Sequence, residues 1–585
     1  MIEAIERWFF MTNQEIAKIF HEIAIYLEMV NGPFKMRAFE KAAEVINGSE
    51  EELINIYKAG GIEALKEIPG VGVSIAEKIE ELIKTGNLKY YSELKKKIPI
   101  DLGSFYGIEG LGPKSLLKLY QKLGIKNIND LEKAAKSGKI RKLEGFGEKS
   151  EERILKGIEF AKRSSGRFIL GFIMPEIREI EKKLNSLKEI QKVIIAGSVR
   201  RRKETIGDVD ILAVAKNSKP VMDYFVSMPE AVHIYACGDT KSAVKLRNGL
   251  DVDLRVVDEK SYGAALNYFT GSKAHNVALR EIALKKGLKL NEYGLFDGKK
   301  QIAGKSEEEL YRALGMEYIE PEMRENFGEI ELAKSKKLPK LIGYSDLKGD
   351  LQIQTNWSDG LNSIEEMAKS AQKNGLEYIA ITDHTKRLAM ANGLDEKRII
   401  EQGKEINKIN KKFESQKKKF RILKGTECDV LKDGALDLPD NILSKLDIVG
   451  VAVHSHFSLS RDEQTKRIIR AMKNSNVDIL FHPTGRIIQK REAYDCDINE
   501  IIKIAKKTKT ILEIDAFPNR LDLKDEYVKK CMESGVKISI DSDAHSLSHI
   551  SYLEYGIAQA RRGWATKNDV INTWPLGKML DFLKK

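Results

Sequence analysis

The sequence predicts a multidomain protein that is helical at the N-terminus, α+β in the middle and α/β at the C-terminus. At 585 residues the chain is too long for a single hydrophobic core, and its length suggests about three to five domains. Up to about residue 165, glycine turns separate amphipathic helical stretches, whereas β-rich segments follow from residue 166. From Gly349 onward short apolar strands alternate with helices, a pattern typical of an α/β domain such as a barrel.

The N-terminal part contains three glycine hairpins. Thr12 or Asn13 is the expected N-cap of the first amphipathic helix. Each hairpin has the pattern apolar-x-Gly-apolar-Gly and leads into a helix, whose N-terminus presents free N–H groups to a phosphate. One such turn is as often an ordinary connector, but three together favour sequence-independent binding of a DNA backbone. The hairpin glycines are Gly70, Gly72, Gly110, Gly112, Gly145 and Gly147.

In the central part, a small-residue turn and clustered arginines precede two carboxylates. Gly-Ser-Val-Arg-Arg at 197–201 is followed by Asp208 and Asp210, whose spacing points both side chains to one face of a strand. The next strand pattern adds Asp251 and Asp253. A lone Asp-x-Asp is more often a solvated strand end, but the turn, the arginines and the second acidic strand favour two-metal phosphoryl or nucleotidyl transfer.

Over residues 12 to about 325 these motifs resemble a family X DNA polymerase, the family of DNA polymerase beta. The resemblance implies helix-hairpin-helix domains followed by a nucleotidyltransferase palm with a mixed sheet. It also implies that Asp208, Asp210 and Asp253 bind two Mg²⁺ ions and that Asp253 activates the primer 3′-hydroxyl. Asp251 is the alternative to Asp253, but the Asp-Leu-Arg context favours Asp253.

The same resemblance assigns the residues that bind the incoming nucleotide. The turn at 197–201 is similar to the one that holds the triphosphate, and 268–272 (Tyr-Phe-Thr-Gly-Ser) is similar to the segment that disfavours ribonucleotides. Asn276 and Arg280 correspond to the residues that read the minor groove of the nascent pair. Core packing is the alternative role for the two aromatic residues. The implied set is Gly197, Ser198, Arg201, Gly207, Tyr268, Phe269, Gly271, Lys273, Asn276 and Arg280.

Lys78 is the candidate for a second activity. In family members with 5′-deoxyribose phosphate lyase activity, the Schiff-base lysine lies in an Ile-Ala-Glu-Lys context, which Lys78 matches. Ser74 stands where the family has a nearby lysine, which weakens phosphate binding there. A solvated helix lysine is the alternative interpretation.

The C-terminal part carries metal-ligand candidates at the ends of apolar strands. Five of the nine histidines of the chain lie there with two acids, which predicts a multinuclear metal site. The region 345–575 resembles a PHP (polymerase and histidinol phosphatase) domain, a distorted (β/α) barrel with a three-metal phosphoesterase site. The resemblance implies 3′–5′ exonuclease or abasic-site cleavage with Mn²⁺ or Zn²⁺. The candidate ligands are Asp359, His384, Glu427, His454, His482, Asp543 and His545.

The first PHP motif departs from the family pattern. Asp-Leu-His-x-His is replaced by Asp-Leu-Gln-Ile-Gln at 350–354, so Gln352 and Gln354 stand in place of two histidines. A neutral amide oxygen is a weaker ligand than imidazole for Mn²⁺ or Zn²⁺, so we expect one metal to be lost or held loosely. The alternative is a catalytically degenerate domain kept for structure or DNA positioning.

The composition agrees with a DNA-binding protein of the cytoplasm. Lys and Arg outnumber Asp and Glu by 99 to 87, a net charge of +12 that favours a polyanionic partner. No apolar run reaches about 18 residues, so no membrane span is expected. The four cysteines have no paired spacing, which argues against disulfides and a cysteine zinc site and predicts a reducing interior.

The sequence therefore predicts a monomeric repair polymerase that fills short gaps, acting on gapped or primer-template DNA with dNTPs. Alternatives are a non-catalytic DNA-binding scaffold and a template-independent nucleotidyltransferase. The expected domains are a lyase-like helical domain (11–95), a second helix-hairpin-helix domain (96–165), the palm (166–260), a thumb-type nucleotide-selection domain (261–330), a linker (331–348) and the PHP domain (349–585).

Overall fold

A computed structural model describes residues 11–583, except for 31, 32, 48, 50, 69, 106, 107, 109, 110 and 165. The chain divides into two compact units. The first holds the residues up to 165 with the short segments 487–492 and 546–549, and the second holds 166–486, 493–545 and the residues from 550 onward. None of the described helices is long and apolar enough to cross a membrane.

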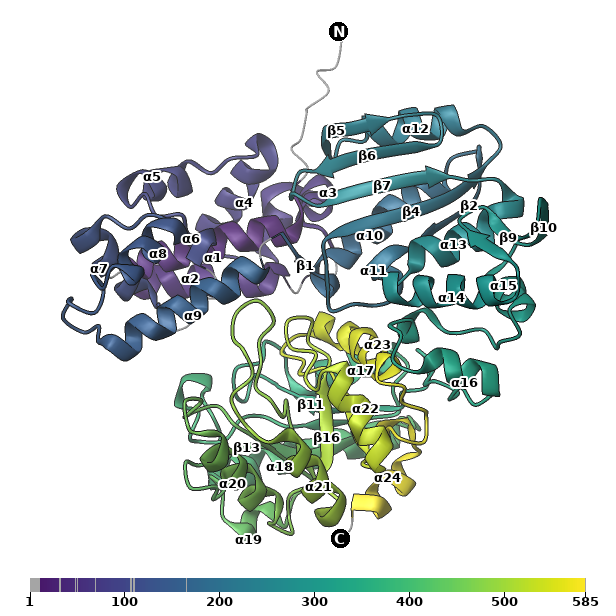
Figure 1. Ribbon diagram of the computed structural model, residues 1–585. Helices are drawn as coiled ribbons and strands as arrows, with labels where there is room; N and C mark the ends of the chain where they lie inside the picture. The colour runs from purple at the N-terminus through teal and green to yellow at the C-terminus, as the bar shows by residue number, and fades with distance from the viewer. Residues whose placement is uncertain are drawn as a thin grey trace. The chain divides into compact units, whose positions relative to one another are not determined.

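The first unit is built from helices (Figure 1). Thr12 caps the first of them through a capping box with Glu15, so the predicted N-cap is confirmed. The apolar faces of the helices share one core that includes Phe20, Leu82 and Leu119. The helices are α1 (Asn13–Met29), α2 (Pro33–Asn47), α3 (Leu53–Lys66), α4 (Val73–Thr85), α5 (Lys89–Lys97), α6 (Leu102–Phe105), α7 (Pro113–Leu123), α8 (Ile128–Lys136) and α9 (Glu148–Ser164).

The three glycine turns connect α3 to α4, α6 to α7 and α8 to α9. Each is closed by a backbone hydrogen bond between residues three apart: Val71 to Ile68 (2.9 Å), Leu111 to Ile108 (3.4 Å) and Phe146 to Leu143 (2.9 Å). Gly70 and Gly145 have φ of 85° and 84°, a conformation that side-chain-bearing residues rarely adopt. Gly72 and Gly112 are the N-caps of α4 and α7, with no side-chain cap, and Gly147 directly precedes α9. Gly110 lies outside the described residues.

The palm is a five-stranded mixed sheet in the order β2-β4-β7-β6-β5. Only the β4–β7 pair is parallel, which confirms the predicted mixed sheet. Two further short strands, β1 (Phe168–Ile169) and β3 (Thr205–Ile206), pair with each other. The elements are α10 (Leu170–Asn185), β2 (Ile190–Ile195), α11 (Gly197–Arg200), β4 (Asp208–Ala215), α12 (Ser218–Ser227), β5 (Ala231–Cys237), β6 (Lys241–Leu246) and β7 (Asp251–Val256).

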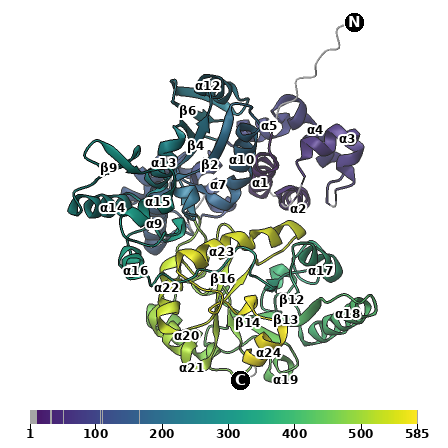
Figure 2. The same cartoon turned by 90° about the vertical axis from the view of Figure 1, so that its right-hand side faces the viewer.

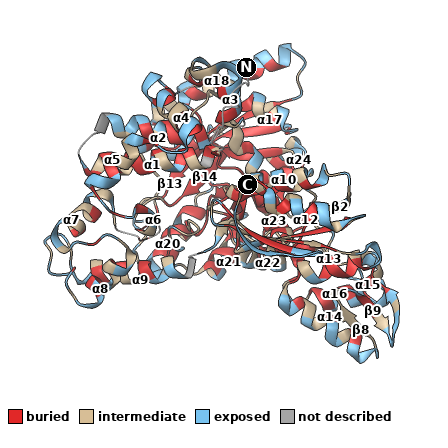
Figure 3. Ribbon diagram, turned by 90° about the horizontal axis from the view of Figure 1, so that it is seen from above, coloured by how far each residue is buried: buried red, intermediate tan, exposed pale blue. Residues whose placement is uncertain are grey.

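The thumb-type region packs helices around a core that includes Leu279, Leu295 and Tyr311, and buried (red) and exposed (pale blue) stretches alternate along α14 in Figure 3. Its last helix, α16, occupies the start of the predicted linker: the lysine-rich sequence is helical there because Ile330 and Ala333 are buried in this core. The elements are η1 (Glu259–Ser261), α13 (Tyr262–Thr270), α14 (Lys273–Lys285), β8 (Lys289–Asn291), β9 (Gly294–Asp297), β10 (Lys300–Ala303), α15 (Glu307–Ala313), η2 (Pro321–Met323) and α16 (Glu329–Ser335).

The C-terminal region is a sheet of seven parallel strands in sequence order, surrounded by helices (Figure 2). A parallel bridge between Ile353 and Ala544 nearly closes the sheet, which confirms the predicted distorted barrel. The strands are β11 (Gly349–Ile353), β12 (Tyr378–Ile381), β13 (Arg421–Asp429), β14 (Ile448–Ala452), β15 (Ile479–Leu480), β16 (Ile511–Asp515) and β17 (Ile538–Asp541). The helices are α17 (Ile364–Lys373), η3 (Ala389–Ala391), α18 (Glu396–Ser415), α19 (Asp440–Leu443), α20 (Arg461–Met472), α21 (Ile498–Thr508), α22 (Asp525–Ser534), η4 (Leu547–Tyr552), α23 (Leu553–Arg562), η5 (Ile571–Thr573) and α24 (Leu576–Leu583).

Candidate active sites

Strands β4 and β7 bring the predicted carboxylates of the palm together. In their parallel register Asp210 lies beside Asp253 and Asp208 beside Asp251, so all four project from one face of the sheet. Burial, followed by the negative charges of Asp208 and Asp253, raises the pKa of Asp210 to about 6. A bound cation would relieve this repulsion, so the cluster fits a divalent metal.

The two candidates for the third carboxylate have different partners. Asp251 contacts Lys245 Nζ at 2.7 Å and accepts a hydrogen bond from the Tyr235 hydroxyl at 3.1 Å. Asp253 has one longer contact, to Lys241 Nζ at 3.3 Å, and its charge acts directly on Asp210. These contacts favour Asp253 as the metal ligand.

The turn before β4 lies directly against Asp210. Gly197 has φ of 61°, and a Cβ atom placed on it would lie 2.6 Å from Asp210 Oδ2. Only glycine therefore allows the turn to lie this close to the carboxylate. Ser198, half-buried, follows it in α11, and Gly207, also half-buried, directly precedes β4.

The arginines of the turn have acidic partners far along the chain. Arg201 Nε lies 3.3 Å from Glu325, and Arg201 Nη1 donates to the Thr270 carbonyl. Arg200 forms two hydrogen bonds with Glu307, at 3.0 and 2.6 Å. Burial alone would raise the pKa of Glu307, but Arg324 and Arg200 hold it at about 2. Neither Glu307 nor Glu325 is predicted from the sequence as a partner of these arginines, because nothing in the local pattern marks partners more than 100 residues away.

Three of the predicted nucleotide-selection residues line one small hollow. They are Tyr268, Asn276 and Arg280. Asn276 Nδ2 donates to the Tyr268 carbonyl at 2.7 Å, while its buried Oδ1 has no hydrogen-bond partner among the described residues. Phe269 is partly buried and packs against the guanidinium of Arg255, 4.6 Å from its ring, and against the ring of Tyr268 at 5.1 Å, so its nucleotide-binding role stays a prediction beside core packing. A Cβ on Gly271 would lie 3.1 Å from Arg201 Nη1.

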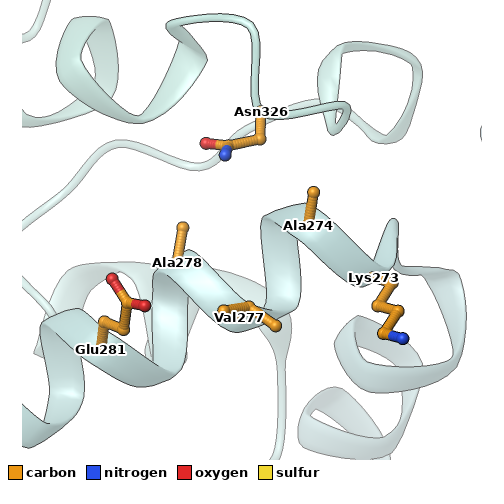
Figure 4. A pocket seen from close by; sticks show the side chains of 6 residues that line it. All are labelled: Lys273, Ala274, Val277, Ala278, Glu281 and Asn326. Atoms are coloured by element: carbon orange, nitrogen blue, oxygen red, sulfur yellow. The ribbon is translucent and has the colours of Figure 1, made fainter.

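Lys273 is separated from this group. It lines a different hollow along α14 with Val277 and Glu281, and Asn326 lies across from the helix (Figure 4). The structure therefore does not bring Lys273 together with Asn276 and Arg280, and its contact with a nucleotide stays a prediction.

Lys78 lies on the exposed side of α4. Its Nζ donates to the hydroxyl of Ser74 at 2.9 Å and to the Ser74 carbonyl at 3.0 Å. The same Nζ lies 5.5 Å from the centre of the Tyr90 ring. Lyase activity stays a prediction.

The carboxyl ends of the barrel strands gather the predicted ligands of the second site around Glu427. His384 Nδ1, His454 Nε2 and His482 Nε2 lie 3.3, 3.1 and 2.8 Å from its carboxylate oxygens. Burial alone would raise the pKa of Glu427, but the three histidines hold it well below its ordinary value. Nearby, Asp359 lies 3.7 Å from both His384 and His545.

Two ligand groups in this site are close enough to hold a metal ion. The donor atoms of Asp359, His384 and His545 all lie within 4.8 Å of one another, and so do those of His384, Glu427 and His454. Imidazole and carboxylate donors suit Mn²⁺ or Zn²⁺. Asp543 is buried beside these groups, 3.8 Å from His545 and 3.7 Å from Arg520.

The position of the two glutamines fits a metal poorly. Gln354 Nε2 donates to Glu427 Oε2 at 2.9 Å, so an amide N–H group faces the carboxylate that a metal would otherwise contact. Gln352 is fully buried, and neither its amide nitrogen nor its oxygen has a hydrogen-bond partner among the described residues. Imidazole and carboxylate donors thus gather around His384 and Glu427, and the loss or loose binding of one metal beside Gln352 and Gln354 stays a prediction.

Four stretches of the chain match known domain families. Residues 11–88 match a helix-hairpin-helix domain, and residues 105–159 match a SAM-like helix-hairpin-helix tandem. Residues 265–325 match the DNA polymerase beta thumb, and residues 350–517 match the PHP domain. The predicted order of folds along the chain is confirmed.

One curated relative aligns with almost the whole chain, and two others align with about a third of it. The DNA polymerase/3′-5′ exonuclease PolX of Bacillus subtilis (strain 168) is 37% identical over 580 residues, which cover 98% of this chain and 100% of that protein. A probable phosphatase of Thermoanaerobacter sp. (strain X514) is 33% identical over 234 residues, 38% of this chain and 89% of that protein. A probable phosphatase of Caldanaerobacter subterraneus is 34% identical over 194 residues, 32% of this chain and 70% of that protein.

Proposed function

Because the chain belongs to the family X DNA polymerases that carry a C-terminal PHP domain, we propose that it acts as a monomer that fills short gaps in DNA during repair, by nucleotidyl transfer from dNTPs. The observation that carries this proposal is the cluster of Asp208, Asp210 and Asp253 beside the Gly197 turn. A non-catalytic scaffold would have no use for a carboxylate whose pKa is raised by two like charges.

Each part of the polymerase site has a role in this reaction. Two Mg²⁺ ions held by Asp208, Asp210 and Asp253 would supply the positive charge that stabilises the transferring phosphate. Asp253 accepts the proton of the primer 3′-hydroxyl, and Ser198 and Arg201 bind the leaving phosphates. Tyr268, Asn276 and Arg280 contact the sugar and the minor-groove edge of the nascent pair, which restricts incorporation to a templated nucleotide. The helix N-termini after the glycine turns bind the backbone of gapped DNA.

Extension of a labelled primer across a short gap tests the assignment. We expect Asp210→Ala and Asp253→Ala each to lower incorporation by at least about a hundredfold, because the developing charge loses its stabilisation. Asp251→Ala is the matched control, since Asp251 lies on the same face of the same strand and should leave most activity. A fully active Asp253→Ala protein, or an Asp251→Ala protein as inactive as Asp210→Ala, would reject the assignment.

We also propose that the PHP domain removes 3′-terminal nucleotides slowly. The two groups around His384 support this, since Mn²⁺ or Zn²⁺ held there would activate water next to a phosphodiester. Gln352 and Gln354 of the first PHP motif weaken the metal site, and a structural PHP domain is the alternative. The relative from Bacillus subtilis carries both activities in its name, DNA polymerase/3′-5′ exonuclease PolX.

The nuclease test uses Asp208→Ala/Asp210→Ala protein, whose polymerase site is silent, with labelled 3′-recessed DNA and Mn²⁺. We expect slow shortening that is lost on adding His384→Ala and His482→Ala and that rises on adding Gln352→His and Gln354→His. Shortening that persists without the histidines would indicate a contaminating nuclease. No shortening without the added histidines would mean that the PHP domain of this chain is structural.

A further inference from the structure

We propose that Arg562, a residue of the PHP barrel, positions the triphosphate-binding Arg201 of the palm, so that the barrel completes the polymerase site. This inference rests on the proposed function as a polymerase. Arg562 would be a positioning residue, because it touches the turn that binds the leaving phosphates and not the nucleotide itself. Its role would not depend on nuclease activity.

The contacts of Arg562 converge on the turn at 197–201, which ends at Arg201 (the Arg201 turn). Arg562 is the last residue of α23, and only 2% of its side chain is exposed. Its Nη1 donates to the backbone carbonyl of Arg201 at 2.9 Å and lies 3.2 Å from Glu325 Oε1. Its Nη2 lies 2.6 Å from the carboxylate of Asp525, at the start of α22. One planar guanidinium therefore joins two barrel helices to the palm turn and the thumb.

Glu325 links Arg562 to the side chain of Arg201. Its Oε1 lies 3.3 Å from Arg201 Nε and 3.8 Å from Lys203 Nζ, in addition to its contact with Arg562. Arg562 thus fixes the backbone of Arg201 directly and its guanidinium through Glu325. The carboxylates of Glu325 and Asp525 thus hold the three cations Arg201, Lys203 and Arg562 next to one another.

The palm and the barrel pack closely enough to hold this arrangement. A Cβ on Gly171 of the palm would lie 2.5 Å from Pro518 Cβ of the barrel, so glycine is required at that contact. Arg486 of the barrel lies 2.8 Å from Glu204, three residues after Arg201. Replacing one member of a buried ion pair leaves the charge of its partner uncompensated, so the test of a positional role must be separated from a loss of stability.

The experiment compares Arg562→Gln with Arg561→Gln in the full-length protein. Arg561 is the matched control because it directly precedes Arg562 on α23 and also contacts residues outside the barrel. It lies 2.7 Å from Glu322 of the thumb and donates to the Ile342 carbonyl of the linker at 2.8 Å. Steady-state insertion of one nucleotide should give a KM for the dNTP about tenfold higher in Arg562→Gln, the loss of roughly one charge-assisted hydrogen bond. The kcat of Arg562→Gln should change less than its KM, and Arg561→Gln should match the wild type in both.

Coupling with Glu325 separates positioning from general destabilisation. If Arg562 acts through Glu325, then Glu325→Gln should raise KM similarly, and the double variant should be no worse than either single variant. Arg562→Lys, which keeps the charge without the planar fork, should recover part of the loss. An unchanged KM in Arg562→Gln, or fully additive effects, would overturn the proposal.

Two further outcomes are also decisive. If Arg562→Gln fails to fold, as judged by its thermal unfolding beside Arg561→Gln, the KM of Glu325→Gln decides the question alone.

If the wild-type protein inserts no nucleotide, the proposed function fails. The dissociation constant for dNTP, measured by calorimetry in the wild type and in Arg562→Gln, then tests the positioning role separately: equal values would overturn it, and weaker binding by Arg562→Gln would support it.

Discussion

At the scale of single residues, a few close contacts determine the polymerase site. The absence of a side chain at Gly197 allows the turn to lie against Asp210. The negative charges of Asp208 and Asp253 in turn raise the pKa of Asp210. The resulting electrostatic strain is a cost of the metal-free protein, because an ionised carboxylate is disfavoured by burial and by like charges. This repulsion should therefore lower the free energy of unfolding of the metal-free protein by a measurable amount.

Asp210→Asn should make the metal-free protein more stable at neutral pH. The folded pKa of about 6 lies above the ordinary value of 3.8 for an aspartate, so the ionised form is disfavoured in the folded state. Below the unfolded pKa the carboxyl group of Asp210 is protonated in both the folded and the unfolded protein and costs no stability. As pH rises through about 6 the folded protein must ionise this buried group, and the stability of the wild type is lowered. The gain in Asp210→Asn should then reach about 3 kcal/mol above that pH and vanish in acid.

Thermal unfolding in a chelator across this pH range measures the effect. Added Mg²⁺ should reverse the order, because it stabilises the wild type by binding its folded state. Equal stability of the two proteins at neutral pH in chelator would contradict the assigned environment of Asp210.

The two glutamines of the PHP motif also act at this scale. The sequence predicts that Gln352 and Gln354, which stand in place of histidines, are weak ligands, and this stays a prediction. It could not show that the amide of Gln354 donates to Glu427, since that pairing joins residues 73 positions apart. This contact gives a physical reason to expect a loosely held or missing metal.

At the scale of elements, the hairpins and strands agree with the sequence because their signals are local. Glycine at φ near 85° marks the turns, and alternating apolar residues mark β4 and β7. The helix α16 occupies the first residues of the predicted linker for a non-local reason. Its lysine-rich sequence resembles a solvated segment, but α16 forms because Ile330 and Ala333 are buried against the thumb core.

Gly145→Ala should weaken DNA binding, and Gly138→Ala should not. Both glycines have positive φ, 84° and 67°, and an added Cβ would make only ordinary contacts, 3.8 Å from Lys118 Nζ at Gly145 and 3.7 Å from Arg141 Nε at Gly138. Each substitution should cost about 1 kcal/mol of stability through the same backbone strain. Only Gly145 belongs to a hairpin that precedes a helix N-terminus, so only its variant should disturb a phosphate contact.

Fluorescence anisotropy with gapped DNA over a range of salt concentrations compares the two variants. Gly145→Ala should bind several-fold more weakly and with a smaller salt dependence, because fewer counterions are released. Equal affinity of the two variants would argue against phosphate binding at this hairpin.

At the scale of the second compact unit, the palm, the thumb and the barrel belong to one unit and contact one another. Arg562, Arg486 and Gly171 belong to contacts between the palm, the thumb and the barrel. If these contacts support the Arg201 turn as proposed, the barrel remains useful to the polymerase even where its own metal site is weakened. A PHP domain with glutamines in its first motif would then be retained for a physical reason.

The sequence by itself determined the order of the folds, the carboxylates of the palm strands and the ligand-bearing loops of the barrel. Those features follow from local periodicity, glycine turns and the spacing of polar residues at strand ends. Only the tertiary structure decided which side chains meet: Asp253 beside Asp210, Gln354 against Glu427, and Arg562 on the Arg201 turn. These pairs join residues dozens to hundreds of positions apart, and a local pattern carries no information about contacts that form only when separate elements pack.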